Sequence, residues 1–142
     1  MSLICRYTGH CRTFYSVAEH SIRVAQIVVP ELKLHALLHD ASEAYIQDIS
    51  RPLKNLLVEY KRLEENLSET IYAKWLKYRD DAAIKKADNI LLVTEGRDLM
   101  GGTEDWGLTE SALTEQIKPW PPVRARYEFL SIFHDEVNNG NR

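Results

Sequence analysis

Apolar residues recur at spacings of three and four along most of this chain, and few segments show the strict alternation of a half-buried strand. The first such segment predicts a helix from Val17 to about Val29, with Pro30 after its end. Ser16 and Glu19 stand at the positions of a capping box, in which two side chains accept backbone N–H groups at the start of a helix. A second helix is expected from about Lys33 to Ile46.

Longer helices are expected in the second half of the chain. Apolar positions from Leu53 to Trp75 predict one long helix or two collinear helices, with Ser50 at the N-cap. Asp80 or Asp81 can cap the next helix, which should end near Met100 because two glycines follow.

The last part of the chain combines a loop with one more helix. Residues 101–121, which include EDWGLTE and PWPP, predict a loop with a short helix at about 110–117. Pro122 suits the first turn of a final helix that ends in a polar tail. No repeat or linker divides the sequence, so we predict a single all-α domain over residues 1–142.

His20 lies in the middle of the apolar stripe of the first predicted helix, three residues after Val17 and four before Val24. Residues at this spacing share one helix face, so the imidazole ring should point into the packed interior. Taken alone, such a histidine is more often a hydrogen-bonded core residue than a metal ligand. Its role therefore depends on which other ionisable groups point inward.

Two other predicted helices also turn ionisable side chains toward the core. In HALLHDASEAY, His39 and Asp40 are adjacent and Glu43 follows about one helical turn later, so the three can converge at one end of a helix face. Asp88 has apolar neighbours at helical spacing. Taken alone, Asp88 is better explained by a salt bridge to Lys85 or Arg97 of its own helix.

Together, these side chains match a metal site. Two imidazoles and two carboxylates on three helices supply a mixed nitrogen and oxygen shell for one divalent transition metal ion. A buried carboxylate is costly unless it is paired or bound to a metal, and one shared site removes several such penalties at once. The expected ligands are His20, His39, Asp40 and Asp88.

Composition narrows the classes of partner. The chain has 18 basic and 21 acidic residues and a net charge of -3, which argues against a nucleic-acid-binding surface. No apolar run approaches the roughly 20 residues that span a membrane, and the N-terminus has no signal-peptide pattern. Cys5 and Cys11 form no C-x-x-C motif and suggest reduced thiols, so we expect a cytoplasmic protein.

The order of a histidine, an adjacent His-Asp pair and a distant aspartate, each on a helix, resembles the HD superfamily of metal-dependent phosphohydrolases. The segments YSVAEHS, ALLHDASEAYIQDISRPLK and KKADNILLVTEGRDLM are similar to successive blocks of small HD hydrolases that act on deoxynucleotides. These are the bacterial 5'-deoxynucleotidases and their phage-encoded relatives, which include deoxynucleoside triphosphohydrolases, some of them specific for dATP. The similarity runs from about Leu3 to about Phe133.

This resemblance implies an HD-domain helical bundle of about five to seven helices, assembled as a homo-oligomer in the cytosol of a bacterium or of a phage-infected cell. It also implies one divalent ion such as Zn²⁺, Mn²⁺ or Co²⁺, held by the four expected ligands. Glu43 and Asp48 correspond to two further catalytic carboxylates. Which of them acts as the general acid or base stays open at this point.

The resemblance assigns substrate contacts as well. Arg6 corresponds to an arginine that contacts the phosphate, although a one-residue deletion in the alignment makes Arg12 a rival. Lys54 falls where the family has a lysine near the phosphate. Tyr7 stands where relatives carry an aromatic residue against the sugar or base, but it replaces a tryptophan, which leaves the base preference open.

The sequence favours a 5'-deoxynucleotidase, which converts a deoxynucleoside monophosphate to a deoxynucleoside and phosphate. Arg6 and Lys54 are the two well-placed cations, whereas a triphosphate calls for more positive charge. A triphosphohydrolase that releases triphosphate from dATP or other dNTPs is the alternative and is nearly as well supported. A non-catalytic nucleotide-binding protein is the third reading, and the presence of both Glu43 and Asp48 argues against it.

Overall fold

Seven α-helices make up most of the structure, a computed structural model that describes residues 1–101 and 106–140. These residues contain no β-strand, which confirms the predicted all-α fold, and the number of helices lies within the expected range. The helices are α1 (Val17–Ile27), α2 (Lys33–Leu38), α3 (Glu43–Ile46), α4 (Arg51–Leu56), α5 (Val58–Trp75), α6 (Asp81–Leu99) and α7 (Pro122–Gly140). Two short 3-10 helices are η1 (Arg6–Gly9) and η2 (Pro30–Leu32).

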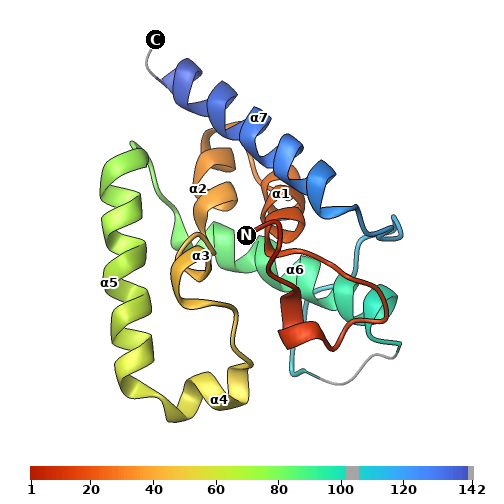
Figure 1. The fold of residues 1–142 in the computed structure, drawn as a ribbon. Coiled ribbons are helices and arrows are strands. Elements are labelled where there is room, and N and C mark those ends of the chain that lie inside the picture. The colour runs from red at the N-terminus through yellow and green to blue at the C-terminus, as the bar shows by residue number, and fades with distance from the viewer. Residues whose placement is uncertain (102–105, 141–142) are drawn as a thin grey trace.

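Helix α1 lies at the centre of the fold and packs against α2, α6 and α7 (Figure 1). It begins as expected, since the Ser16 side chain accepts the backbone N–H of Glu19 at 3.1 Å. It ends slightly early, at Ile27, because Val28 is already extended ahead of Pro30. The core cluster around it consists of Tyr15, Val24, Ala25, Leu32, Ala36, Ile84, Ala87, Leu91, Leu99 and Ile117.

The prediction of one helix from Lys33 to Ile46 was wrong in its middle. Helix α2 ends at Leu38 and α3 begins at Glu43. Between them the chain makes tight turns, in which the Ala41 N–H bonds to the Leu38 carbonyl at 3.0 Å, a three-residue spacing in place of the four-residue spacing of an α-helix. The adjacent His-Asp pair therefore stands just beyond the end of α2.

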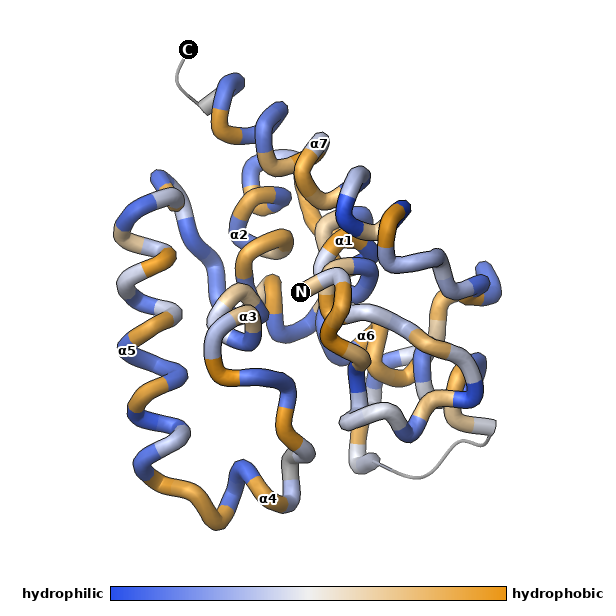
Figure 2. The backbone as a smooth tube through the Cα atoms, in the orientation of Figure 1, coloured by the Kyte–Doolittle hydropathy of each residue, from blue (hydrophilic) through white to orange (hydrophobic). Residues whose placement is uncertain are grey.

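The predicted helix over residues 53–75 was also wrong in its geometry, because α4 and α5 are separate and not collinear. Leu57, with φ -109° and ψ 83°, leaves the helical region, and α4 runs across the lower end of α5 (Figure 1). We call residues 51–75 the arm. None of the α5 residues is buried. Large exposed apolar side chains gather at the corner, where Figure 2 shows a hydrophobic stretch: Leu53, Leu56, Leu57 and Val58.

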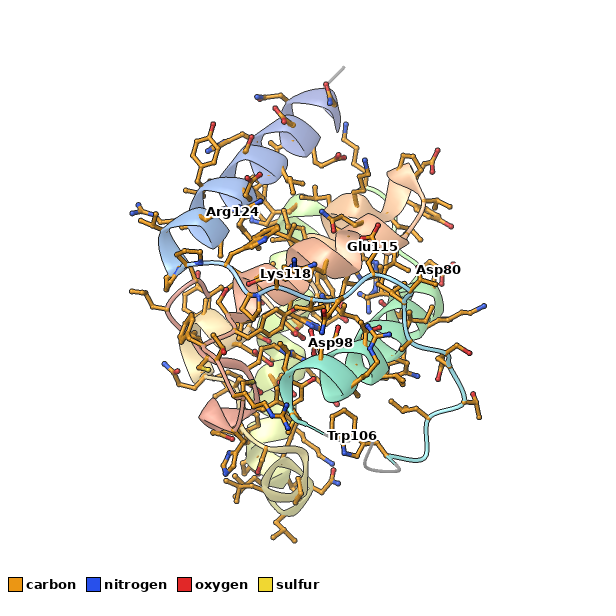
Figure 3. The ribbon with its side chains drawn as sticks, turned by 90° about the vertical axis from the view of Figure 1, so that its right-hand side faces the viewer. Asp80, Asp98, Trp106, Glu115, Lys118 and Arg124 are labelled. Atoms are coloured by element: carbon orange, nitrogen blue, oxygen red, sulfur yellow. The ribbon has the colours of Figure 1, made fainter. Side chains whose placement is uncertain are left out.

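Residues 106–121, which we call the strap, contain no helix, so the short helix expected at 110–117 is absent. Figure 3 shows the strap passing α6 on its way to α7. Its backbone N–H groups donate to side chains of α6: Leu113 to Thr94 Oγ1 at 2.9 Å and Ile117 to Asp98 Oδ2 at 2.8 Å. An N–H that bonds to another helix cannot also close a helical turn of its own.

The two long helices that frame the strap begin and end as expected. Asp80 caps α6 by accepting the Ala83 N–H at 3.0 Å, and Gly101 follows the end of α6 with a left-handed φ of 84°. Helix α7 begins at Pro122. Among the described residues, no helix is both long and apolar enough to cross a membrane.

Replacing Ser16 with alanine should destabilise the protein by about 1 kcal/mol, because the first turn of α1 loses its capping acceptor. Urea unfolding of chelator-treated protein, followed by circular dichroism, measures the change. Ser50→Ala is the matched control: Ser50 holds the N-cap position of α4 without a capping hydrogen bond, so its loss should change stability by less than about 0.5 kcal/mol. Equal losses in both variants would contradict the capping role.

Candidate metal centre

Two histidines and two aspartates from three parts of the chain lie side by side in the interior. His20 comes from α1, His39 and Asp40 follow α2, and Asp88 lies on α6. The Nε2 atom of His20 is 3.3 Å from Nε2 of His39 and 3.3 Å from Oδ1 of Asp88. The Oδ2 atom of Asp40 lies 3.5 Å from the same His20 nitrogen. We call these four side chains the cluster.

Within the cluster, His20, His39 and Asp88 each offer one donor atom, and these atoms lie within 4.8 Å of one another, close enough to hold one metal ion. Asp40 is shared with a neighbouring cation. Its Oδ2 atom lies 3.3 Å from Nε2 of His39 and also accepts a hydrogen bond from Nη1 of Arg6 at 3.0 Å. The Asp40 carboxylate thus stands between the histidines and a buried guanidinium.

The second nitrogen of each histidine ring is fixed by an acceptor. Nδ1 of His20 lies 2.7 Å from Oε1 of Glu95, and Nδ1 of His39 lies 2.7 Å from the carbonyl of Ala36. A carboxylate and a carbonyl can only accept, so both Nδ1 atoms donate. In the neutral rings the lone pairs are therefore on Nε2, the two atoms that face each other inside the cluster.

The charges inside the cluster shift its protonation. Burial and the charge of Arg6 lower the pKa of His20, but Glu95 and Asp88 outweigh them and raise it to about 9. Burial works to raise the pKa of Asp88, while the hydrogen bond and charge of His20 hold it well below its usual range. Lys85 adds an ion pair to Asp88 at 2.8 Å. The His20 imidazolium thus supplies positive charge that a metal ion would replace, with release of a proton.

Glu43 and Asp48, the two predicted catalytic carboxylates, flank the cluster. Glu43 is buried at the start of α3, and its Oε2 atom has no hydrogen-bond partner among the described residues. Burial, together with the charges of Asp40 and Asp48, raises the pKa of Glu43 to about 9. Asp48 accepts the backbone N–H of Tyr7 at 3.0 Å, and burial raises its pKa as well. A buried oxygen without a partner is available to water or a ligand.

The short helix η1 brings the predicted phosphate arginine to the cluster. Arg6 is buried, and besides its bond to Asp40 it keeps an Nε atom without a partner among the described residues. Its guanidinium also lies over the Tyr7 ring, 5.2 Å from the centroid. The rival Arg12 is exposed and lies against Gly101, at the end of α6. Of the two arginines, Arg6 is the one in contact with Asp40.

Lys54 is engaged on the arm. Its Nζ atom pairs with Glu64 of α5 at 2.7 Å and lies 5.7 Å from the centroid of the Tyr60 ring. Its positive charge still reaches Asp48, where it acts against the rise in pKa that burial causes. The sequence expectation of a lysine beside a phosphate therefore requires Lys54 to leave Glu64.

Glu95 of α6 belongs to the same group of side chains, although the sequence analysis did not single it out. It is fully buried and contacts His20, Tyr7 and Arg6. Its position seven residues after Asp88 was a usable signal, because two helical turns return to the same face of a helix. Two inward acids on one helix face, Asp88 and Glu95, indicate that both belong to the same site.

These contacts fit a divalent transition metal ion. The donors are two imidazole nitrogens and carboxylate oxygens, the set that zinc, manganese and cobalt accept in proteins. Both imidazoles have their outer nitrogen hydrogen-bonded, as metal-ligating histidines usually do. Residues that can hold the ion are His20, His39 and Asp88, with Asp40 adjacent.

Fold and cluster together define a class: all-helical proteins whose interior holds a histidine–aspartate group able to bind a metal ion. The chain is 43% identical to the uncharacterized protein YfdR of Escherichia coli over an alignment of 142 positions. The alignment covers 95% of this chain and 79% of that protein. The chain therefore belongs to the YfdR family. It is also 28% identical to an uncharacterized protein of Rhodobacter capsulatus, across 89% of this chain and 77% of the relative. No protein-family model matches it.

Glu43→Gln should stabilise the metal-free protein, and the gain should grow as the pH rises from 5 to 9. The folded state holds a proton on Glu43 up to about pH 9, whereas the unfolded chain loses it near its ordinary pKa of 4.5, so stability falls with pH across this interval. Glutamine has no proton to lose. We expect the rise in Tm to be about 10 °C larger at pH 8 than at pH 5, measured by thermal unfolding with a chelator.

Glu65→Gln, on the exposed side of α5, is the control and should leave the pH dependence unchanged. A Glu43→Gln variant that is less stable than the parent at pH 8 would show that the Glu43 carboxylate is stabilising as an ion.

Proposed function

We propose that the protein is a metal-dependent phosphohydrolase of the HD superfamily that acts on deoxynucleotides. Its reaction would be that of a 5'-deoxynucleotidase, from a deoxynucleoside monophosphate to a deoxynucleoside and inorganic phosphate. The observation that carries the proposal is that the cluster lies beside Glu43 and Arg6, which both keep a buried polar atom without a partner among the described residues. The resemblance of the surrounding sequence blocks to HD deoxynucleotide hydrolases supplies the class of substrate.

Hydrolysis of a phosphate ester requires neutralisation of negative charge, a water nucleophile and a proton for the leaving oxygen. A divalent ion bound by the cluster supplies positive charge and lowers the pKa of a nearby water. Arg6 is suited to bind a phosphate oxygen, because its guanidinium is held at the cluster by Asp40 while its Nε–H remains free to donate. Tyr7 follows it along the chain and would contact the sugar.

The two flanking carboxyl groups divide the proton transfers. Burial and the neighbouring carboxylates raise the pKa of Glu43 in the metal-free protein, so this group is suited to carry a proton to the leaving oxygen from Oε2. Asp48, in the loop after α3, can accept a proton from the attacking water. This assignment makes Glu43 the general acid and Asp48 the general base.

The surrounding cations support a monophosphate rather than a triphosphate. A triphosphate chain needs several positive groups beyond the first phosphate. Lys54 is paired with Glu64 and Lys85 with Asp88. Arg6 is paired with Asp40 as well, but it differs from them in lying at the cluster with one N–H group left over. Arg6, with its unpartnered Nε atom, is the basic residue best placed to receive a single phosphate.

The test is turnover of dAMP and dATP by chelated protein to which Mn²⁺, Co²⁺ or Zn²⁺ is returned, with the products separated by chromatography. We expect phosphate release from dAMP. Asp88→Asn should remove bound metal and lower turnover at least about 100-fold. Asp48→Asn should lower turnover by about 100-fold or more while the metal stays bound. Asp135→Asn, at an exposed acid on α7, is the control and should keep parental turnover.

Other outcomes decide between the alternatives. Triphosphate released from dATP, with dAMP left intact, would establish the triphosphohydrolase reaction instead. Nucleotide that binds to the metal-loaded protein and is recovered uncleaved would establish a non-catalytic binding protein. Full turnover by Asp48→Asn would remove that carboxylate from the mechanism.

We propose further that the protein acts in the cytoplasm as a homodimer joined through the arm. Helix α5 has no buried residue, although helices of its length usually depend on packing of one face. A twofold axis would place the apolar corner of the arm against its own copy.

Replacing both Leu56 and Val58 with glutamate should convert the dimer to a monomer, because like charges would meet at the buried centre of the interface. Light scattering coupled to gel filtration measures the mass. Val123→Glu, at a similarly exposed apolar residue on α7, is the matched control and should leave the mass unchanged. A parent protein that is monomeric at micromolar concentration would refute the assembly and leave the proposed reaction untouched.

A further inference from the structure

Glu95 is a buried acid that contacts three residues of the candidate site, His20, Tyr7 and Arg6. Its side chain has 0% exposure and lies on α6, two helical turns beyond Asp88. Oε1 is 2.7 Å from Nδ1 of His20, while Oε2 accepts the Tyr7 hydroxyl and lies 3.6 Å from Nη2 of Arg6. One carboxylate thus joins a predicted metal ligand to both predicted substrate contacts of η1.

The contact with His20 fixes the direction of that ring. A carboxylate accepts only, so Nδ1 must donate, and Nε2 must face His39 and Asp88. Rotation of the ring would break a buried hydrogen bond to a charged group, which contributes more than a neutral one. The His20 ring is therefore held in the orientation that a cation in the cluster requires.

The contacts with η1 hold a strained piece of backbone. Tyr7 and Thr8 have φ values of 55° and 53°, a left-handed conformation that non-glycine residues adopt only when their surroundings impose it. Two side chains secure the segment: Asp48 accepts the Tyr7 N–H and Glu95 accepts the Tyr7 hydroxyl. These bonds add to the Arg6–Asp40 hydrogen bond in holding η1 against the cluster.

A purely structural ion pair explains these contacts less well. Glu19 shows what such a pair looks like in this protein: it is equally buried on α1, but it binds Arg23 and the backbone N–H of Trp120, neither of which belongs to the cluster. Each partner of Glu95, by contrast, has a role in the site proposed above. The two glutamates therefore form a natural comparison.

We propose that Glu95 is a positioning residue that couples the metal ligands to the substrate contacts. It orients the His20 ring toward the other cluster residues, and it holds Arg6 and Tyr7 beside the cluster. The metal half of this proposal needs only the cluster, whereas the substrate half rests on the proposed function.

The first test measures metal affinity by chelator competition, together with the visible spectrum of the Co²⁺ form. Glu95→Gln keeps the size of the side chain but loses its charge, and we expect Zn²⁺ and Co²⁺ to bind about 10–100-fold more weakly, with an altered Co²⁺ spectrum. Glu19→Gln is the matched control: it removes an equally buried charge away from the cluster, so metal affinity should stay within about twofold of the parent.

Affinity and spectrum unchanged in Glu95→Gln, with metal binding lost in His20→Ala, would overturn the metal half. This result is distinct from failure of the proposed function, in which the parent protein binds metal but hydrolyses no nucleotide. If Glu95→Gln does not fold, Glu95→Asp provides the same test, because it keeps the charge but withdraws the carboxylate from His20 and should also weaken metal binding.

The second test measures amide hydrogen exchange in residues 5–10 by mass spectrometry. Tyr7→Phe removes the hydroxyl bond to Glu95 and leaves His20 untouched. We expect exchange in η1 to become at least about tenfold faster in both Tyr7→Phe and Glu95→Gln, while metal affinity falls only in Glu95→Gln. Parental exchange rates in both variants would show that Glu95 does not hold η1 and would overturn the substrate half.

Discussion

Charge balance in a buried space is the constraint on which this structure depends. Asp40, Asp88 and Glu95 bring three carboxylates to the place where α1, α2 and α6 meet, and His20 and Arg6 supply the positive charge that faces them. An ionised group in the interior is strongly destabilising without a partner, so each of these residues depends on the others. A bound divalent cation would satisfy the same constraint with more charge in less space, because it would replace the proton on His20.

The scaffold uses buried polar side chains to hold its least regular parts. The strap has no helix of its own, yet Thr94 and Asp98 of α6 and Glu19 of α1 accept its backbone N–H groups. The strap thereby joins α1, which carries His20, to α6, which carries Asp88. The interruption between α2 and α3 serves the site in a similar way, since it sets the adjacent His-Asp pair at a helix end while Glu43 begins the next helix. The irregular backbone between α2 and α3 thus places two side chains of the cluster, His39 and Asp40.

Two elements near the cluster, α5 and η1, have little support from the apolar core. Helix α5 has no buried residue, and η1 holds two residues in a left-handed conformation. Both are attached by polar contacts, through Tyr72 to the carbonyl of His39 in one case and through Tyr7 to Glu95 in the other. Local stability is lower where apolar contacts are few, and substrate-binding segments are commonly of this kind. Polar side chains, rather than apolar packing, therefore hold α5 and η1 beside the cluster.

The sequence alone determined the helical class, the capped starts of α1 and α6, and the residues that turn inward, because these follow from local spacing and capping chemistry. The inward direction of His20 and Asp88 followed from apolar neighbours one helical turn away, whereas His39 and Asp40 lie in the turns beyond the end of α2. The breaks at Leu57 and after Leu38, the extended strap and the role of Glu95 did not follow. Each depends on partners distant in the chain. Strap N–H groups bond to side chains of helices, and Glu95 meets His20 and Tyr7 only when α1 and η1 pack onto α6. Periodicity reports which face of a helix is buried, and tertiary packing decides what that face meets.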